Sequence, residues 1–151
     1  MNSVILSTAT RLLMPVILIL SFFVFYRGHN EPGGGFIGGL LAATAFALLE
    51  KAEGLEAARR ALRFNPMSIA AIGLACTLVS GLWGGFVYGD FLKGVWPFLS
   101  VAEDGSKAGL PIGSIFLFDL GVYLVVLGVI CAILFALEEA VRAEADPGGD
   151  A

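Results

Sequence analysis

The sequence predicts an all-α polytopic membrane protein with four transmembrane helices and a short amphipathic interfacial segment between helices two and three. Of the 151 residues, 58% are hydrophobic and only 15% are charged, whereas soluble domains carry about 25% charged residues. The mean hydropathy is +0.88. The apolar residues fall into four long runs, each near the roughly 20 residues that cross a bilayer. A chain of this composition is expected to lie mostly in lipid.

The first expected span runs from Val4 to Tyr26. Arg11 lies inside it, and its long side chain is expected to snorkel to the membrane surface. Pro15 leaves two possibilities open, because a proline inside a helix removes a backbone hydrogen bond. It either kinks the helix or separates the span from residues 1–11, which would then lie along the membrane interface.

The second expected span runs from Gly33 to Glu50, and Glu31 followed by Pro32 forms the pattern of a helix cap with a first-turn proline. This span is about 27 Å long at the helical rise, so it only just crosses the hydrocarbon. Residues 51–64 are polar and amphipathic, which is typical of a helix that lies in the interface.

Asn65 and Pro66 repeat the cap-and-proline start and open a third expected span that ends near Tyr88. Residues 89–111 contain glycine, proline and several charged residues and are expected to form a loop. The fourth expected span covers residues 112–137.

The four spans are expected to form a single transmembrane domain over residues 1–140, followed by an acidic, disordered cytoplasmic tail over residues 141–151. Lysine and arginine are distributed unevenly over the two sides. One side holds Arg11, Lys51, Arg59, Arg60, Arg63 and Arg142, and the other holds Arg27, Lys93 and Lys107. Because cytoplasmic loops carry the excess of basic residues, a multi-pass protein of the cell membrane with both termini in the cytoplasm is expected.

Several function classes are excluded by composition. The net charge is −4 and no basic patch interleaves with aromatic residues, so no nucleic-acid partner is expected. Cys76 and Cys131 lie inside apolar runs, and with a single histidine they offer no metal or cofactor site. We expect no enzyme, because no nucleophile stands beside a general base.

A glycine-rich segment from Gly28 to Leu40 separates the first two spans. Its Gly-x-Gly-x-x-Gly spacing matches a dinucleotide fingerprint, but an apolar helix of membrane length precedes it where that motif needs a strand. Two interpretations stay open: close helix packing through small residues, and a broken helix start that lines a polar cavity. The helix-packing candidates are Gly34, Gly35, Gly38, Gly39, Gly81, Gly85, Gly121 and Gly128.

Asp119 is the most informative single residue, because it lies about two turns inside the fourth span, where an acid must face protein or water. It shares a helix face with Tyr123, while Gly121 and Gly128 point nearly the opposite way. A helix with an acidic face and a small-residue face is expected to lie between neighbours, and we expect partner subunits to supply them. The candidates for an ion path or a buried ion pair are Asp119, Glu31, His29, Arg27 and Lys93.

Three stretches resemble the MnhB/MrpB-like membrane subunit of the multisubunit Mrp-type sodium/proton antiporter. They are residues 27–42 (RGHNEPGGGFIGGLLA), residues 116–126 (FLFDLGVYLVV) and the opening Thr10-Arg11-Leu12-Leu13 with Pro15. The resemblance covers all four spans. It implies a non-catalytic membrane subunit of a bacterial complex that exchanges Na⁺ for H⁺ and is related to the membrane arms of respiratory complex I and of hydrogenases. The implied partners are the other subunits of that complex.

Two roles within such a complex stay open. The chain could hold neighbouring subunits together, or it could also line part of the ion path, with Asp119, Glu31 and His29 as polar waypoints and Arg27 or Lys93 as counter-charges. The alternative identity is a detached subunit-A-type domain, or the equivalent subunit of a related complex-I-like or hydrogenase membrane arm.

Overall fold

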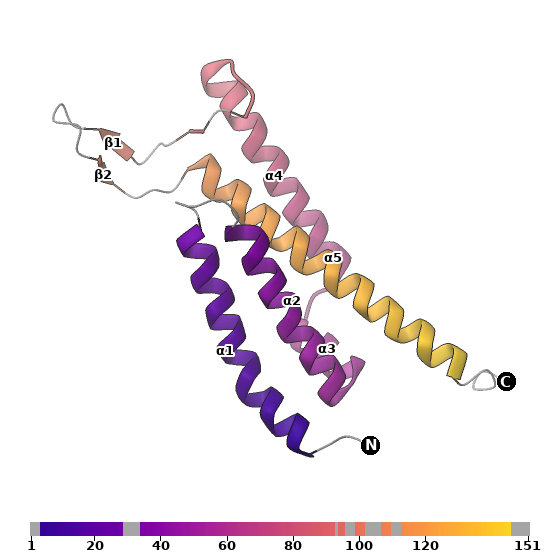
Figure 1. The fold of residues 1–151 in the computed structure, drawn as a ribbon. Helices are drawn as coiled ribbons and strands as arrows, with labels where there is room; N and C mark the ends of the chain where they lie inside the picture. Colours follow the sequence, from indigo (N-terminus) through magenta and orange to yellow (C-terminus); the bar gives the residue numbers. More distant parts are fainter. Residues whose placement is uncertain are drawn as a thin grey trace.

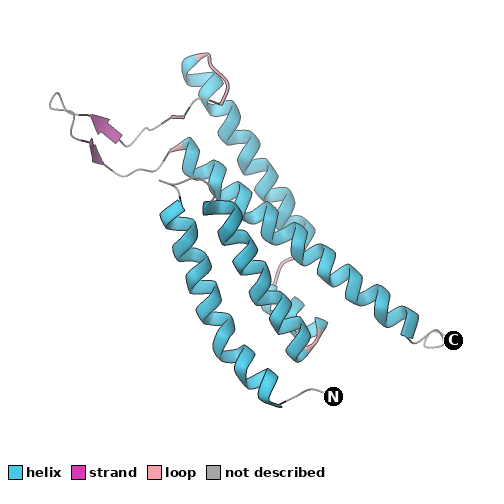
Figure 2. Ribbon diagram, in the orientation of Figure 1, coloured by secondary structure: helices cyan, strands magenta, loops and turns pink. Residues whose placement is uncertain are grey.

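The computed structural model describes residues 4–28, 34–92, 94–95, 99–101, 107–109 and 113–145. Within these ranges the chain forms helices and one short hairpin (Figures 1 and 2). In chain order the elements are α1 (Val4–Gly28), α2 (Gly34–Glu53), α3 (Leu55–Leu62), α4 (Pro66–Tyr88), β1 (Leu99–Val101), β2 (Lys107–Gly109) and α5 (Ser114–Ala145).

Four helices are long and apolar enough to cross a membrane, which confirms the predicted architecture. The helix α1 is continuous through Pro15, so the separate amphipathic lead that the sequence left open is not formed by the described residues. The helix α5 has 32 residues, or about 48 Å at the helical rise, and it continues beyond residue 137 into residues expected to belong to the tail.

The prediction of a loop over residues 89–111 is wrong for β1 and β2. These two strands pair antiparallel, with Leu99 opposite Gly109 and Val101 opposite Lys107. Strands of three residues are too short to show an alternating apolar pattern, which explains why the pattern of residues does not reveal them.

The turns around α3 follow from single residues. Gly54 separates α2 from α3 at φ 93°, a left-handed conformation that glycine adopts without a steric penalty. The amphipathic α3 then buries Leu55, Ala58 and Leu62 on one face, as its pattern predicts. Asn65 starts α4, because its side-chain oxygen accepts a hydrogen bond of 2.9 Å from the Met67 N–H.

The four long helices lie side by side in the order α1, α2, α5, α4 (Figure 1). The helix α2 packs against α1 on one side and α5 on the other, and α5 packs in turn against α4. In the apolar stretch of α2 that could cross a membrane, 56% of the residues are buried within the chain, against 17% in the corresponding stretch of α1. The start of α1, the end of α5 and α3 lie at one end of the molecule, and the hairpin lies at the other (Figure 1). A row of this kind leaves broad apolar faces open on both sides.

The apolar core lies where α2, α3 and α5 meet. The buried members of this cluster are Ala42, Ala43, Phe46, Leu55, Ala58, Leu62, Leu127, Cys131 and Phe135. Small residues on α2 let α5 approach, and the aromatic side chains fill the space toward α3. The core therefore fixes the position of α2 relative to α5, on which the site below depends.

Candidate functional site

The carboxylate of Asp119 on α5 contacts the first turn of α2. Its Oδ1 atom accepts a hydrogen bond of 2.8 Å from the backbone N–H of Gly35. The first N–H groups of a helix have no acceptor within the helix, and the helix dipole favours a negative charge there. The contact therefore gives an acid inside an apolar helix a complementary partner, and it satisfies a backbone donor of α2 at the same time.

This contact requires glycine in α2. A Cβ atom at Gly35 would overlap the backbone oxygen of Asp119 and would lie 2.6 Å from Oδ1. One turn later, a Cβ at Gly39 would lie 2.8 Å from the backbone oxygen of Tyr123. Gly35 and Gly39 thus face α5, and their missing side chains allow the two backbones to touch.

The neighbouring pair of glycines faces α1 instead. A Cβ at Gly38 would lie 3.0 Å from the backbone oxygen of Ser21. A Cβ at Gly34 would lie 2.5 Å from Cα of Gly28 and 3.1 Å from Oδ2 of Asp119. One pair of glycines, Gly35 and Gly39, therefore contacts α5, and the other, Gly34 and Gly38, contacts α1. The start of α2 is held between these two helices.

A second polar contact lies one turn along α5. The Ser21 hydroxyl donates a hydrogen bond of 2.8 Å to the backbone oxygen of Gly38 and is 2.9 Å from the Tyr123 hydroxyl. Because the single Ser21 proton is directed at Gly38, the Tyr123 hydroxyl is the donor in the second bond. Ser21 is fully buried, and the Tyr123 ring packs on Phe25 at a centroid distance of 5.2 Å. This chain of bonds connects α1, α2 and α5.

The opposite face of α5 packs against α4. A Cβ at Gly121 would lie 2.7 Å from the backbone oxygen of Gly73, and a Cβ at Gly128 would lie 2.6 Å from the backbone nitrogen of Ala70. The two faces of α5 are therefore covered by the chain's own α2 and α4. The expectation that partner subunits cover these two faces is corrected, because the row arrangement supplies both neighbours from within the chain.

Two glycines of α4 have a different environment from the expected helix stripe. In the described part of the chain, a Cβ at Gly81 would meet the end of the Leu92 side chain at 3.1 Å, and one at Gly85 would meet the Phe91 ring at 2.8 Å. Both positions face the turn that follows α4. The glycine that brings α4 close to α5 is Gly73, which sequence reasoning missed.

The other predicted site residues lie at the same end as Asp119 or outside the described ranges. Arg27 is in the last turn of α1, next to Gly28, which meets Gly34 at the start of α2. His29, Glu31 and Lys93 lie outside the described residues. Among the residues that are described, no three potential metal ligands lie close enough together to hold an ion.

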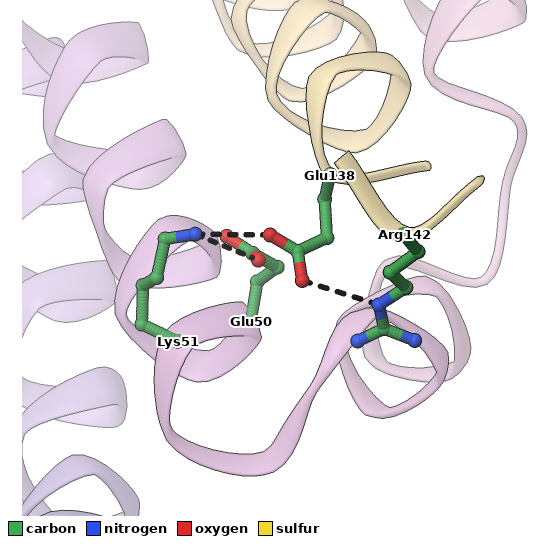
Figure 3. A network of polar contacts seen from close by, with 4 residues as sticks. All are labelled: Glu50, Lys51, Glu138 and Arg142. Carbon is green, nitrogen blue, oxygen red and sulfur yellow. Dashed lines mark hydrogen bonds and ion pairs between the residues drawn. The ribbon is translucent and has the colours of Figure 1, made fainter. Parts of the chain in front are cut away.

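A network of charged side chains at the opposite end of the helices was not predicted (Figure 3). The Lys51 ammonium lies 3.2 Å from Oε1 of Glu50 and 3.1 Å from Oε2 of Glu138, and the other Glu138 oxygen lies 3.1 Å from Nε of Arg142. The Glu50 side chain is only 2% exposed. Lys51 therefore compensates a buried carboxylate on α2 and joins α2 to α5.

A further pair joins α1 to α2 at the same end. The Arg11 Nε lies 2.6 Å from Oε1 of Glu53, which also accepts a hydrogen bond of 3.0 Å from the Ser7 hydroxyl. The Arg11 side chain is 73% exposed, and its reach to the membrane surface stays a prediction. The sequence could indicate only the local Glu138–Arg142 spacing, because contacts between helices leave no periodic signal.

Comparison with known proteins places the chain in a family. The family described as "Domain related to MnhB subunit of Na+/H+ antiporter" matches residues 5–132. The chain is 40% identical over 139 residues to the Na⁺/H⁺ antiporter B subunit of Bacillus subtilis, covering 91% of this chain and 94% of that protein. It is 35% identical over 142 residues to the protein of the same name from Alkalihalophilus pseudofirmus, with the same coverage of both.

A solved structure shows the same fold. The match is to a chain in the "Structure of Mrp complex from Dietzia sp. DQ12-45-1b", with a TM-score of 0.72 and 37% identity. It covers 89% of this chain and 14% of that chain, so the present chain spans only a small part of the longer polypeptide. On these matches, the chain belongs to the family of domains related to the MnhB subunit of Na⁺/H⁺ antiporters.

Proposed function

We propose that this chain is a non-catalytic membrane subunit of a multisubunit cation/proton antiporter, in which it holds neighbouring subunits together. The observation that carries the proposal is the match along 94% of two relatives named as the B subunit of a Na⁺/H⁺ antiporter. The alternative, a detached subunit-A-type domain or the equivalent subunit of a related complex-I-like or hydrogenase membrane arm, is not favoured by these two matches. Na⁺ and H⁺ are the ions that the relatives' names imply for the whole complex.

The arrangement of helices supports a role in assembly. The helices lie in an open row, and large apolar side chains of α1 and α4 are exposed, among them Phe22, Phe23, Leu78 and Phe86. Exposed apolar faces of this size on a membrane protein are covered by lipid or by other helices. A flat subunit with two open faces can lie between two larger subunits.

The geometry of Asp119 also supports a positioning role. Its contact with the Gly35 N–H fixes the start of α2, and the Tyr123–Ser21–Gly38 bonds hold the next turn. An acid that is used to hold a helix start gives a sufficient reason for its depth in the span. We therefore favour a structural role for Asp119 over a role in the ion path.

The test compares the whole complex with its parts in sealed vesicles. Vesicles that contain the complete complex are expected to exchange Na⁺ for H⁺, which a pH-sensitive dye reports. Vesicles that contain the complex without this chain, or the purified chain alone, are expected to show no exchange. Exchange by the chain alone would contradict the proposal, and so would full exchange by a stable complex that lacks it.

A further inference from the structure

A pocket of about 370 Å³ lies between α3, the start of α4 and α5. It is at the end of the molecule where α3 lies, opposite the hairpin (Figure 1). Arg59 and Arg63 line it together with Phe64, Met67 and Glu139. A basic pocket between helices at a membrane surface is a suitable place for an anionic headgroup.

The pocket carries a net positive charge. The Nη2 atom of Arg59 lies 2.5 Å from Oε1 of Glu139, so this arginine is neutralised by a neighbour on α5. Within the described ranges, no carboxylate pairs with Arg63. The Arg63 guanidinium is therefore available, and its planar set of donors matches two phosphate oxygens at once.

The backbone at Arg63 determines which variant tests this side chain. Arg63 ends α3 at φ 63° and ψ −35°, and its N–H donates a hydrogen bond of 3.1 Å to the Arg59 carbonyl. A positive φ strains a residue that has a Cβ atom, whereas glycine adopts it without this penalty. A change of Arg63 to glycine therefore removes the guanidinium without adding strain to the backbone.

Apolar side chains flank the charged part of the pocket. Phe64 is 72% exposed and Met67 is 65% exposed, and Phe135 of α5 closes the inner wall. A free anion would gain nothing from these groups, whereas the acyl chains of a lipid would cover them. The arrangement of an arginine above exposed apolar side chains fits a molecule with a phosphate and a hydrocarbon part.

We propose that this pocket binds the headgroup phosphate of an anionic phospholipid, with Arg63 as its principal ligand and the acyl chains against Phe64 and Met67. Glu139 weakens the site by neutralising Arg59. The bound lipid would fill the space between α3 and α5 and fix the interfacial helix against the long helix.

The test uses the assembled complex in phosphatidylcholine vesicles with a trace of a photoactivatable phosphatidylglycerol. Cross-linking to the segment that contains Phe64 and Met67 is measured by mass spectrometry. In the Arg63→Gly variant this labelling is expected to fall about fivefold, while the thermal stability of the complex in pure phosphatidylcholine is unchanged or higher, because glycine relieves the backbone strain.

Two further variants are expected to raise the labelling or to leave it unchanged. Glu139→Gln frees Arg59 and is expected to raise the labelling. Arg60→Gln removes the same charge from α3, but Arg60 does not line the pocket, so the labelling is expected to stay within error of the unchanged complex.

Four results would overturn the proposal. They are equal labelling by a photoactivatable phosphatidylcholine, no labelling by either probe, unchanged labelling in Arg63→Gly, and suppression of the labelling by inorganic phosphate, which would assign the pocket to a free anion. If Arg63→Gly instead lowers the yield of the complex without changing the labelling of the complex that remains, the pocket receives an acidic segment of another subunit and not a lipid.

Discussion

At the scale of residues, the carboxylate of Asp119 and the first turn of α2 depend on each other. The Gly35 N–H needs an acceptor, since no earlier helical carbonyl can reach it. The Asp119 charge needs a polar partner inside an apolar helix. The sequence singles out Asp119 by its depth and the glycines by their spacing. It cannot indicate that the two meet, because 84 residues separate Gly35 from Asp119 and no local pattern connects them.

Substitutions of Asp119 separate its charge from its hydrogen bond. Asp119→Asn keeps an oxygen for the Gly35 N–H but loses the charge at the helix start, so we expect a loss of about 0.3–1 kcal/mol in stability. Asp119→Leu leaves the N–H without this acceptor and is expected to cost about 1–3 kcal/mol. Thermal denaturation of the complex measures both.

The same vesicles show whether Asp119 has a second role. If it only positions α2, antiport per assembled complex is unchanged in Asp119→Asn at every pH tested. A loss of antiport with full assembly, partly restored in Asp119→Glu, would instead place Asp119 on the ion path. Tyr123→Phe is the matched control, because it removes a partly buried hydroxyl one turn away without removing a charge.

The buried carboxylate of Glu50 gives a second prediction at this scale. Lys51→Met removes a cation beside a side chain that is 2% exposed, and an uncompensated buried charge is strongly destabilising. Glu50→Gln leaves Lys51 paired with Glu138 and is expected to lower the melting temperature of the complex less. The double variant should be more stable than Lys51→Met alone. If Lys51→Met had a higher melting temperature than both Glu50→Gln and the double variant, Lys51 would not compensate the Glu50 charge.

At the scale of elements, the two faces of α5 were predicted correctly as an acidic face and a small-residue face, but their neighbours were not. Periodicity assigns residues to faces, because it depends only on the helical repeat. It does not say which helix covers each face. Gly121 meets Gly73, and Gly39 meets Tyr123, yet all four lie in runs of similar composition. The small hairpin strands were missed for a related reason, since three residues carry no period.

Alanine substitutions distinguish glycines at helix crossings from other glycines. Gly121→Ala places a methyl group 2.7 Å from the Gly73 carbonyl oxygen, and the resulting overpacking is expected to cost about 1–3 kcal/mol. Gly81→Ala is the control, because among the described residues its methyl group would meet only the flexible end of Leu92, at 3.1 Å. We expect a lower melting temperature and a lower yield of complex for Gly121→Ala, and little change for Gly81→Ala. Similar results for the two variants would contradict the assignment of Gly121 to a close crossing.

At the scale of the whole molecule, the open row of helices explains how a small subunit can be buried in a larger assembly. The helices α2 and α5 are central, and α1 and α4 form the two edges. The apolar side chains on these two edge helices are not buried by the rest of the described chain. They can therefore contact lipid or larger subunits. The number of spans could be predicted, because each needs its own apolar run. The order in the row could not, because it depends on which small-residue faces pair.

The orientation of the row in the membrane follows from charge and is the last prediction. The end that contains α3 and the charged network holds six of the nine lysine and arginine residues, which predicts that it faces the cytoplasm. Asp90, which follows α4 and is exposed, reports the end of the molecule opposite α3. Ser68, at the start of α4, reports the other end.

The measurement uses single cysteines in the assembled complex, in a background in which Cys76 and Cys131 are replaced by alanine. A membrane-impermeant maleimide added to intact cells is expected to label Asp90→Cys but not Ser68→Cys, and opening the cells should allow both to react. The same complex must still exchange Na⁺ for H⁺, which shows that the labelled form is the native one. Labelling of Ser68→Cys in intact cells would reverse the orientation. It would also place the Glu50–Lys51–Glu138 network and the proposed lipid pocket at the outer surface, so the lipid probe would then have to be supplied to the outer leaflet.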